Sequence, residues 1–145
     1  MEKNNSVRAR RILERAESEG RNFLLEPEVY ALLKLFGFKV PSHIFLKSGE
    51  KLKADDLKKI KSKEAVVKVV SPLIQHKSDV GGVALVKNSR REIELAINDM
   101  KKRVGVAFSR LDKSHKISPA EVEESIRGFL IVERVNYLQV GFGSE

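Results

Sequence analysis

A short run of β-branched residues that ends at a proline constrains the fold of this chain more than any other feature. Residues 65–70 read Ala-Val-Val-Lys-Val-Val and are followed by Ser71 and Pro72. β-branched residues favour strands, and a proline cannot continue the hydrogen-bond ladder of a central strand. The run therefore predicts a buried strand that ends before Pro72. A second apolar run at 83–87 predicts the strand that follows the intervening loop.

The loop between these two strands is polar, basic and rich in glycine. It contains His76, Lys77, Ser78, Asp79 and the pair Gly81-Gly82. Paired glycines permit positive φ angles, so the N–H groups of residues 79–83 are predicted to form an anion-binding nest for phosphate. Lys68 on the strand and Lys77 in the loop would add positive charge.

Each of these features also has an ordinary structural explanation. A single histidine after a strand is often structural, and a glycine pair often marks a hairpin turn. Lys68 would equally suit the solvent side of an alternating strand. The hairpin and the phosphate loop are compatible, because a turn can also hold phosphate.

The remaining segments predict an α+β fold with several strands packed against helices. The patterns favour three helices, the first over 7–18 capped by Ser6, the second from Pro27 to just before Gly37, and the third opening at Ser89. A short helix is expected from Asp55 or Asp56. Strands are also expected at 43–46, 129–135 and 138–142, the last two joined by a turn at 136–137. The segment 109–125 is expected to be polar and mobile, with one short helical turn capped by Ser118.

Three stretches resemble the nucleotide-forming acyl-CoA synthetases, in particular the ATP-grasp β-subunit of ADP-forming acetate–CoA ligase. Residues 66–83 match the family's VxKxxSPxxxHKSDxGGV signature at every fixed position. Residues 25–41 resemble its opening helix and turn, and residues 129–135 resemble the ATP-grasp hinge strand. The resemblance implies a first ATP-grasp subdomain with a mixed sheet and flanking helices. It implies a partial nucleotide-binding domain over 23–145, preceded by a basic helix over 1–22.

The resemblance also implies roles for individual residues. His76 matches the histidine that relays phosphate between acyl phosphate and ADP; imidazole suits this role because its neutral nitrogen is a nucleophile at pH 7. Lys68 matches the lysine that reaches the nucleotide phosphates. The residues that match the flexible loop over the phosphates are Lys77, Ser78, Asp79, Gly81 and Gly82. The residues that match the adenine hinge and the ribose-binding acid are Glu133, Arg134, Val135 and Glu145.

The chain departs from the family pattern at its end. It stops at Glu145, where the family continues into a second half that carries the magnesium ligands, and residues 134–144 exceed the usual turn before the ribose acid. The coenzyme A-binding domain, with the first phosphohistidine, also has no counterpart. We therefore expect a fragment or one member of a hetero-oligomer, which uses ATP or ADP and Mg²⁺, finds its metal ligands outside this chain and does not turn over alone.

Composition narrows the alternatives. The chain has 145 residues, which is typical of one domain, and 41% hydrophobic content suffices for a core. It has no cysteine, and its three histidines show no zinc-site spacing. No apolar run is long enough to cross a membrane and the charged start lacks a secretion signal, so a soluble cytoplasmic protein is expected.

The net charge of +8 raises the possibility of a nucleic-acid partner. The basic residues are interleaved with acids, aromatic residues make up only 6%, and tryptophan is absent. This composition makes nucleic-acid binding a third hypothesis, after an acyl-CoA synthetase part and a non-catalytic module that binds nucleotide or a partner chain. A positive field would equally suit ATP and coenzyme A.

Overall fold

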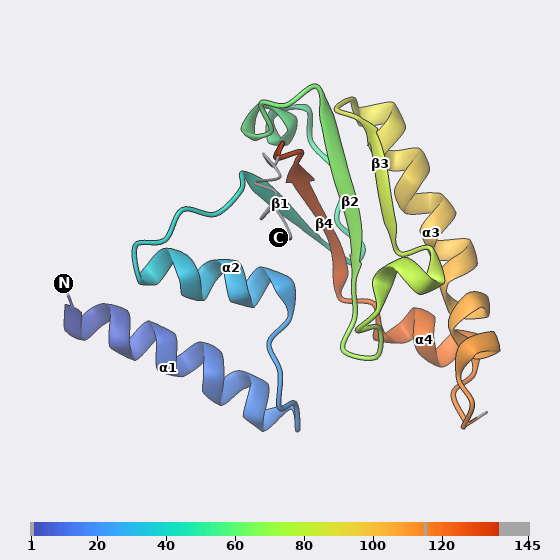
Figure 1. Ribbon diagram of the computed structural model, residues 1–145, viewed down its shortest axis with the longest axis horizontal. Coiled ribbons are helices and arrows are strands. Elements are labelled where there is room, and N and C mark those ends of the chain that lie inside the picture. The colour runs from blue at the N-terminus through green and yellow to red at the C-terminus, as the bar shows by residue number, and fades with distance from the viewer. Residues whose placement is uncertain (1, 115, 137–145) are drawn as a thin grey trace, which may run out of the picture.

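The computed structural model describes residues 2–114 and 116–136 as an α+β fold (Figure 1). The element order confirms most of the predicted helices and strands. The elements are α1 (Glu2–Ser18), α2 (Glu26–Leu35), β1 (His43–Lys47), the 3-10 helix η1 (Ala54–Lys59), β2 (Glu64–Val70), the 3-10 helix η2 (Lys77–Val80), β3 (Val83–Lys87), α3 (Arg90–Leu111), α4 (Pro119–Ser125) and β4 (Gly128–Glu133).

The four strands form one sheet in the order β1-β4-β2-β3. All three pairings are antiparallel, so the α+β class is confirmed, whereas the described sheet is antiparallel throughout and not mixed. Strand β2 lies between β4 and β3, with Lys68 opposite Leu130 on one side and Val83 on the other. The last strand in sequence is thus inserted beside the first.

The main core lies between one face of the sheet and the helices α3 and α4. Alternate residues of β2 and β4, including Val67, Val69 and Ile131, point into it and are fully buried. Helix α3 contributes residues at helical spacing, among them Ile93, Met100 and Val104. Burial of this large apolar set is the main force that stabilises the fold.

The opposite face of the sheet is covered only in part. A smaller cluster of Val70, Leu130 and Val132 packs against Leu25 and Tyr30 from the region of α2. On the neighbouring strand, Val83 and Leu85 lie on the same face as Lys68 and are 37% and 52% exposed. Figure 1 shows α1 and α2 on one side of the sheet and α3 on the other. This partly open face is where the site described below is found.

Several predicted boundaries were wrong, and strand β4 ends at Glu133 and not at residue 135. Helix α1 begins at Glu2 and not at Val7, and Asn5 within the added turn donates a hydrogen bond from its side chain to the Leu35 carbonyl. Helix α3 continues to Leu111, into the segment expected to be polar and mobile. Helix α4 is longer than one turn, because Ser118 and Glu121 form a reciprocal capping box and Val122 is fully buried.

Gly105 explains how α4 packs so closely on α3. A Cβ atom at this position would lie 2.7 Å from the carbonyl oxygen of Pro119. Only glycine permits this approach, and the contact was not evident from a glycine within a helical pattern. The predicted strand at 138–142, the turn at 136–137 beyond Asn136, and Glu145 lie outside the described residues.

Candidate functional site

The loop that joins β2 to β3 contains a 3-10 turn and two glycines, and each position needs a glycine for a different reason. Gly81 has φ +70°, in the left-handed region that side chains rarely adopt. Gly82 has an ordinary φ, but a Cβ there would lie 2.5 Å from Cγ1 of Val69. The first glycine therefore permits the turn, and the second lets the loop return against β2.

The predicted anion nest is not formed, because the loop uses its own N–H groups. The amides of Asp79, Gly81 and Gly82 donate to the carbonyl oxygens of His76, Ser78 and Lys77, at 3.2, 3.3 and 2.7 Å. These bonds close a hairpin-like turn, as predicted by the ordinary structural explanation of the glycine pair. Any anion at this loop must therefore be bound mainly by side chains.

Side chains of the loop, of β2 and of α2 line one pocket of about 760 Å³. Five of the residues singled out from the sequence meet here, while Gly81 and Gly82 are not among the lining residues. The lining residues used below are Glu26, Tyr30, Lys68, His76, Lys77, Ser78 and Asp79. The sequence resemblance had grouped the lysines, the histidine and the loop, and the structure brings them to one cavity.

Glu26, which was not predicted, joins the two lysines of this pocket. Lys68 Nζ donates to Glu26 Oε1 at 2.6 Å, and Lys77 Nζ donates to Glu26 Oε2 at 3.1 Å. Partial burial raises the pKa of Glu26, but the hydrogen bonds and charges of Lys68 and Lys77 outweigh it, so the pKa lies below its usual value. The carboxylate is therefore ionised at neutral pH.

His76 immediately precedes η2 and is exposed. Its imidazole lines the main pocket and also a neighbouring one of about 350 Å³ that contains Phe108 and Asp112. An exposed ring at the rim of a lysine-bearing pocket can be reached by a phosphoryl donor from outside. This position suits a nucleophile that receives a group from one partner and passes it to another.

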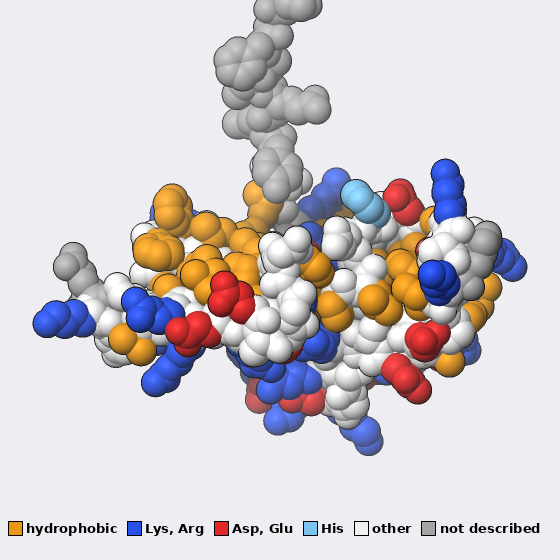
Figure 2. Space-filling view, turned by 90° about the horizontal axis from the view of Figure 1, so that it is seen from below, with side chains coloured by type: hydrophobic (Ala, Val, Ile, Leu, Met, Phe, Trp, Pro, Cys, Tyr) orange, Lys and Arg blue, Asp and Glu red, His pale blue; other side chains and the backbone are white. Residues whose placement is uncertain are grey.

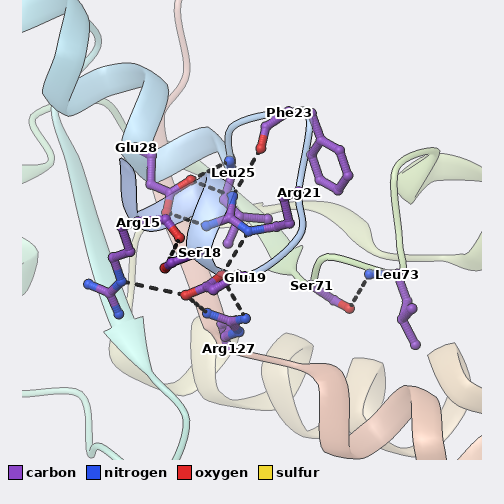
Figure 3. A network of polar contacts seen from close by, with 10 residues as sticks. All are labelled: Arg15, Ser18, Glu19, Arg21, Phe23, Leu25, Glu28, Ser71, Leu73 and Arg127. Atoms are coloured by element: carbon purple, nitrogen blue, oxygen red, sulfur yellow. Dashed lines mark hydrogen bonds and ion pairs between the residues drawn. The ribbon is translucent and has the colours of Figure 1, made fainter. Parts of the chain in front are cut away.

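A second charged network fixes the segment that leads into α2 (Figure 3). Arg21 is 8% exposed and donates to both carboxylate oxygens of Glu28 at 2.8 Å, to Glu19 and to the Phe23 carbonyl. Glu28 in turn accepts a hydrogen bond from the Leu25 amide at 2.8 Å. These bonds hold the backbone on both sides of Glu26 and so determine where its carboxylate lies.

The guanidinium groups of this network strongly shift the pKa of a neighbouring carboxylate. Hydrogen bonds from Arg127 and Arg21 lower the pKa of Glu19 to about 2. Arg127 reaches Glu19 with both guanidinium nitrogens, at 3.2 and 3.0 Å, and thereby ties the start of β4 to the end of α1. The network therefore joins three separate segments of the chain.

The end of β2 is held by a buried serine. Ser71 is 2% exposed, its hydroxyl lies 2.6 Å from the hydroxyl of Ser125, and it accepts a hydrogen bond from the Leu73 amide. These contacts fix the point at which the chain leaves β2 for the loop. Sequence reasoning used Pro72 as the stop signal and missed Ser71, although a serine before proline is itself a turn signal.

The predicted hinge residues do not line the pocket. Glu133 accepts a hydrogen bond from the Ser42 amide at 2.9 Å, and Arg134 forms an ion pair with Glu64. Val135 is 42% exposed. Glu133 lies opposite Ala65, three positions before Lys68 on β2, which corresponds to about 10 Å along the strand. Glu145 lies outside the described residues.

Within residues 2–114 and 116–136, no three His, Asp or Glu side chains come together as a metal site. In the same part of the chain, no helix is both long and apolar enough to cross a bilayer. Figure 2 shows Lys and Arg side chains interspersed with Asp and Glu on the face it presents, without a continuous basic surface.

Two curated relatives are similar to this chain in sequence. It is 31% identical over 140 residues to a 4-hydroxybutyrate–CoA ligase (ADP-forming) of Nitrosopumilus maritimus, covering 96% of this chain and 19% of that protein. It is 40% identical over 89 residues to the subunit beta of acetate–CoA ligase (ADP-forming) I of Pyrococcus furiosus, covering 61% of this chain and 37% of that protein. The chain thus spans about a fifth to somewhat over a third of these relatives.

Two solved structures, both from Candidatus Korarchaeum cryptofilum, have a similar fold. One is described as ACD1 in complex with coenzyme A, with TM-score 0.66 and 25% identity, and covers 89% of this chain and 49% of that one. The other, a dinucleotide-forming acetyl-coenzyme A synthetase 1 with coenzyme A, Ca-AMPCP and HgCl⁺, has TM-score 0.62 and 28% identity over 89% and 50% of the two chains.

A family profile described as an ATP-grasp domain matches residues 15–132, which is most of the chain. The match includes β2, the loop and the pocket-lining residues described above. The relatives that share these segments are named ADP-forming CoA ligases. The sequence resemblance to this group is therefore confirmed, and the chain belongs to the ATP-grasp domain family.

Proposed function

We propose that this chain is the first nucleotide-binding lobe of an ADP-forming acyl-CoA synthetase and that His76 carries the phosphoryl group. The observation that supports this most is the meeting of His76, Lys68 and Lys77 at one pocket of about 760 Å³. The names of the relatives support the reaction class. The remaining parts of the enzyme belong to a longer chain or to a coenzyme A-binding partner.

His76 would act as a nucleophile and then as a donor. A ring nitrogen attacks the phosphorus of a phosphoryl donor, a nitrogen–phosphorus bond forms, and the bond to the donor's leaving group breaks. In the second step, a terminal phosphate oxygen of ADP attacks the same phosphorus, the nitrogen–phosphorus bond breaks, and ATP is formed. The exposed position of His76 lets the ring face first one reactant and then the other.

Lys68 and Lys77 would neutralise the charge that develops on the phosphoryl oxygens. Two fixed ammonium groups at a partly closed pocket stabilise such charge more than solvent does. Ser78 and Asp79 line the same pocket, and Ser78 can donate a hydroxyl hydrogen bond to phosphate. Gly81 and Gly82 would act through the backbone, by allowing the loop that carries these side chains.

The nucleotide would lie along the open face of the sheet. We place its adenine near Glu133, Arg134 and Val135 and its phosphates at Lys68, about 10 Å away along the strands. The ribose-binding role of Glu145 and the boundary between residues 22 and 23 rest on the resemblance alone. Magnesium, if used, would be held by ligands from the remainder of the enzyme.

Phosphohistidine labelling tests this function. The chain is combined with its coenzyme A-binding partner, acyl-CoA and labelled inorganic phosphate. Acid-labile, base-stable label is expected on the wild type and absent from His76→Ala. His43→Ala is the control, because His43 is not among the residues that line this pocket and its Nδ1 contacts the Pro41 carbonyl. Equal labelling of wild type and His76→Ala contradicts the assignment.

A non-catalytic nucleotide-binding or subunit-interaction module is the second candidate. It is favoured by the hydrogen bonds within the loop, because the amides of Asp79, Gly81 and Gly82 already donate to carbonyl oxygens of the loop and cannot also bind phosphate. This alternative predicts nucleotide binding to the assembled protein with no label on His76. The same experiment therefore separates the two.

A further inference from the structure

The carboxylate of Glu26 occupies a position between the two pocket lysines that a phosphate group would also need. Each of its oxygens accepts a hydrogen bond from one lysine, at 2.6 Å from Lys68 and 3.1 Å from Lys77. Oε1 also accepts a hydrogen bond from the Tyr30 hydroxyl at 3.3 Å. A tetrahedral phosphate would present oxygens to these same donors.

The position of Glu26 is determined by the fold and not by the lysines alone. It is the first residue of α2, between Leu25, whose amide is bound by Glu28, and Pro27, whose φ is restricted by its ring. Glu28 is held by the buried guanidinium of Arg21. The Glu26 backbone is thus anchored from outside the pocket, so its carboxylate can leave the lysines only by rotation of the side chain.

The three charges do not balance. Two ammonium groups face one carboxylate, and their side chains are 25% and 17% exposed against 24% for Glu26. This set of three charges is therefore net positive, Asp79 at the same pocket offsets it, and the pocket becomes net positive when the Glu26 side chain turns away. Opposite charges in such a partly exposed cluster hold each other in place until a stronger partner arrives.

We propose that Glu26 is an internal competitor for phosphate, which keeps Lys68 and Lys77 aligned and gives them up when phosphate oxygens bind. The proposal rests on the proposed function only in assuming that a phosphate group enters this pocket. It assigns Glu26 as a positioning residue that sets how strongly the pocket binds phosphate. A ligand with several phosphate groups would displace it more readily than one with a single phosphate.

The proposal predicts that removal of the Glu26 charge strengthens anion binding. Glu26→Gln keeps the size of the side chain and frees both ammonium groups. We expect the affinity for tripolyphosphate to rise by roughly tenfold, well below the unscreened Coulomb value because the pocket is open to solvent. A residue that only supported the site would have the opposite effect, since its loss would disorder the lysines and weaken binding.

Calorimetric titration with tripolyphosphate at constant ionic strength tests this on the 145-residue chain. Glu94→Gln is the matched control, because it removes the same charge from α3 on the other side of the sheet, where Glu94 pairs with Arg90. The control should bind as the wild type does. The gain in Glu26→Gln should disappear in Glu26→Gln/Lys77→Met, because the freed ammonium group is then missing.

Equal or weaker binding by Glu26→Gln overturns the proposal, as does a lack of tripolyphosphate binding by the wild type and every variant. If Glu26→Gln does not fold, Glu26→Asp replaces it, since its shorter carboxylate cannot reach both lysines, and a smaller gain is expected; no gain overturns the proposal. The labelling of His76 is measured separately. A labelled His76 with no gain in Glu26→Gln therefore refutes the competition while the proposed function stands.

Discussion

Two ion clusters lie within a few residues of each other in sequence and have opposite charge arrangements. In one, the buried cation Arg21 serves two carboxylates, Glu19 and Glu28. In the other, the anion Glu26 serves two ammonium groups, Lys68 and Lys77. In the first, Arg15 and Arg127 also pair with Glu19, and the cluster joins backbone segments. The second has two cations for one anion and lies at a pocket that also contains Asp79.

This difference separates a structural cluster from a binding cluster. The Arg21 side chain is only 5% exposed and its donors are directed to protein acceptors. The lysines of the other cluster line a pocket and share one acceptor, the Glu26 carboxylate. An incoming anion can compete for lysines held in this way, whereas it would have to disrupt the fold to reach Arg21.

The largest expected effect is on stability, from Arg21→Met. Removing Arg21 leaves the Glu28 carboxylate without its guanidinium partner, while Glu19 keeps Arg127, and we expect a loss of about 3 kcal/mol in the free energy of unfolding. Urea unfolding followed by circular dichroism measures it. Arg15→Met is the control, because the Arg15 side chain is 72% exposed and its pair with Glu19 spans 3.6 Å. Similar small losses in both variants would show that Arg21 is not structurally special.

Lys68→Met should show the reverse pattern, with binding affected more than stability. We expect tripolyphosphate affinity to fall roughly tenfold, since a charge-assisted hydrogen bond to the ligand is lost. Stability should change by less than about 1 kcal/mol, because this pair is partly exposed. Lys87→Met, at the far end of β3, serves as the control and should bind normally. A loss of stability without a loss of binding would show that Lys68, like Arg21, stabilises the fold and does not bind the anion.

The next smaller effect is the loss of folding stability in acid, which should differ between variants of the two clusters. The folded-state pKa of Glu19 is about 2 against an ordinary 4.5, and that of Glu28 is also lowered by Arg21 and the Leu25 amide despite burial, which raises it. A lowered folded pKa contributes stability above the unfolded pKa, and this stability is lost as pH falls from about 5 to about 2. Arg21→Met should flatten this dependence more than Lys68→Met. Thermal unfolding at several pH values measures it, and an equal slope in both variants would contradict the comparison.

The smallest expected effect concerns local opening of the loop. The amides of Ser78 to Gly82 should exchange with solvent faster than those of Val67 to Val70, because Val80 is the one apolar side chain buried there, whereas the strand is buried and paired on both sides. Exchange in the loop should slow when nucleotide binds the assembled enzyme. Protection equal to that of β2 and unchanged by ligand would make the loop a rigid hairpin turn.

Local patterns allowed much of the fold to be predicted. The β-branched run before Pro72 located β2, Ser89 located the start of α3 through its hydrogen bond from the Glu92 amide, and the signature segment identified Lys68 and His76. Each of these depends on residues close together in the chain. The start of α1 and the length of α4 were less accurate, because contacts with Leu35 and the α3 surface decide them.

The missed residues depend on contacts between distant segments. Glu26 lies 42 positions before Lys68, and nothing in the helix-opening pattern showed that its carboxylate reaches β2. The predicted nest was wrong because glycine freedom does not specify where amides point, and here carbonyls of the same loop accept them. The residues next to a charged side chain at a helix start do not predict which distant residue it will pair with.

The central claim is that His76 passes a phosphoryl group to ADP with the help of the lysine pocket. It is tested most directly by a chase of enzyme labelled on His76, prepared in the assembled complex and then mixed with unlabelled ADP. The label should move from protein to ATP in the wild type and much more slowly in Lys68→Met. Label that stays on the protein after ADP is added to the wild type, with no labelled ATP formed, would contradict the account.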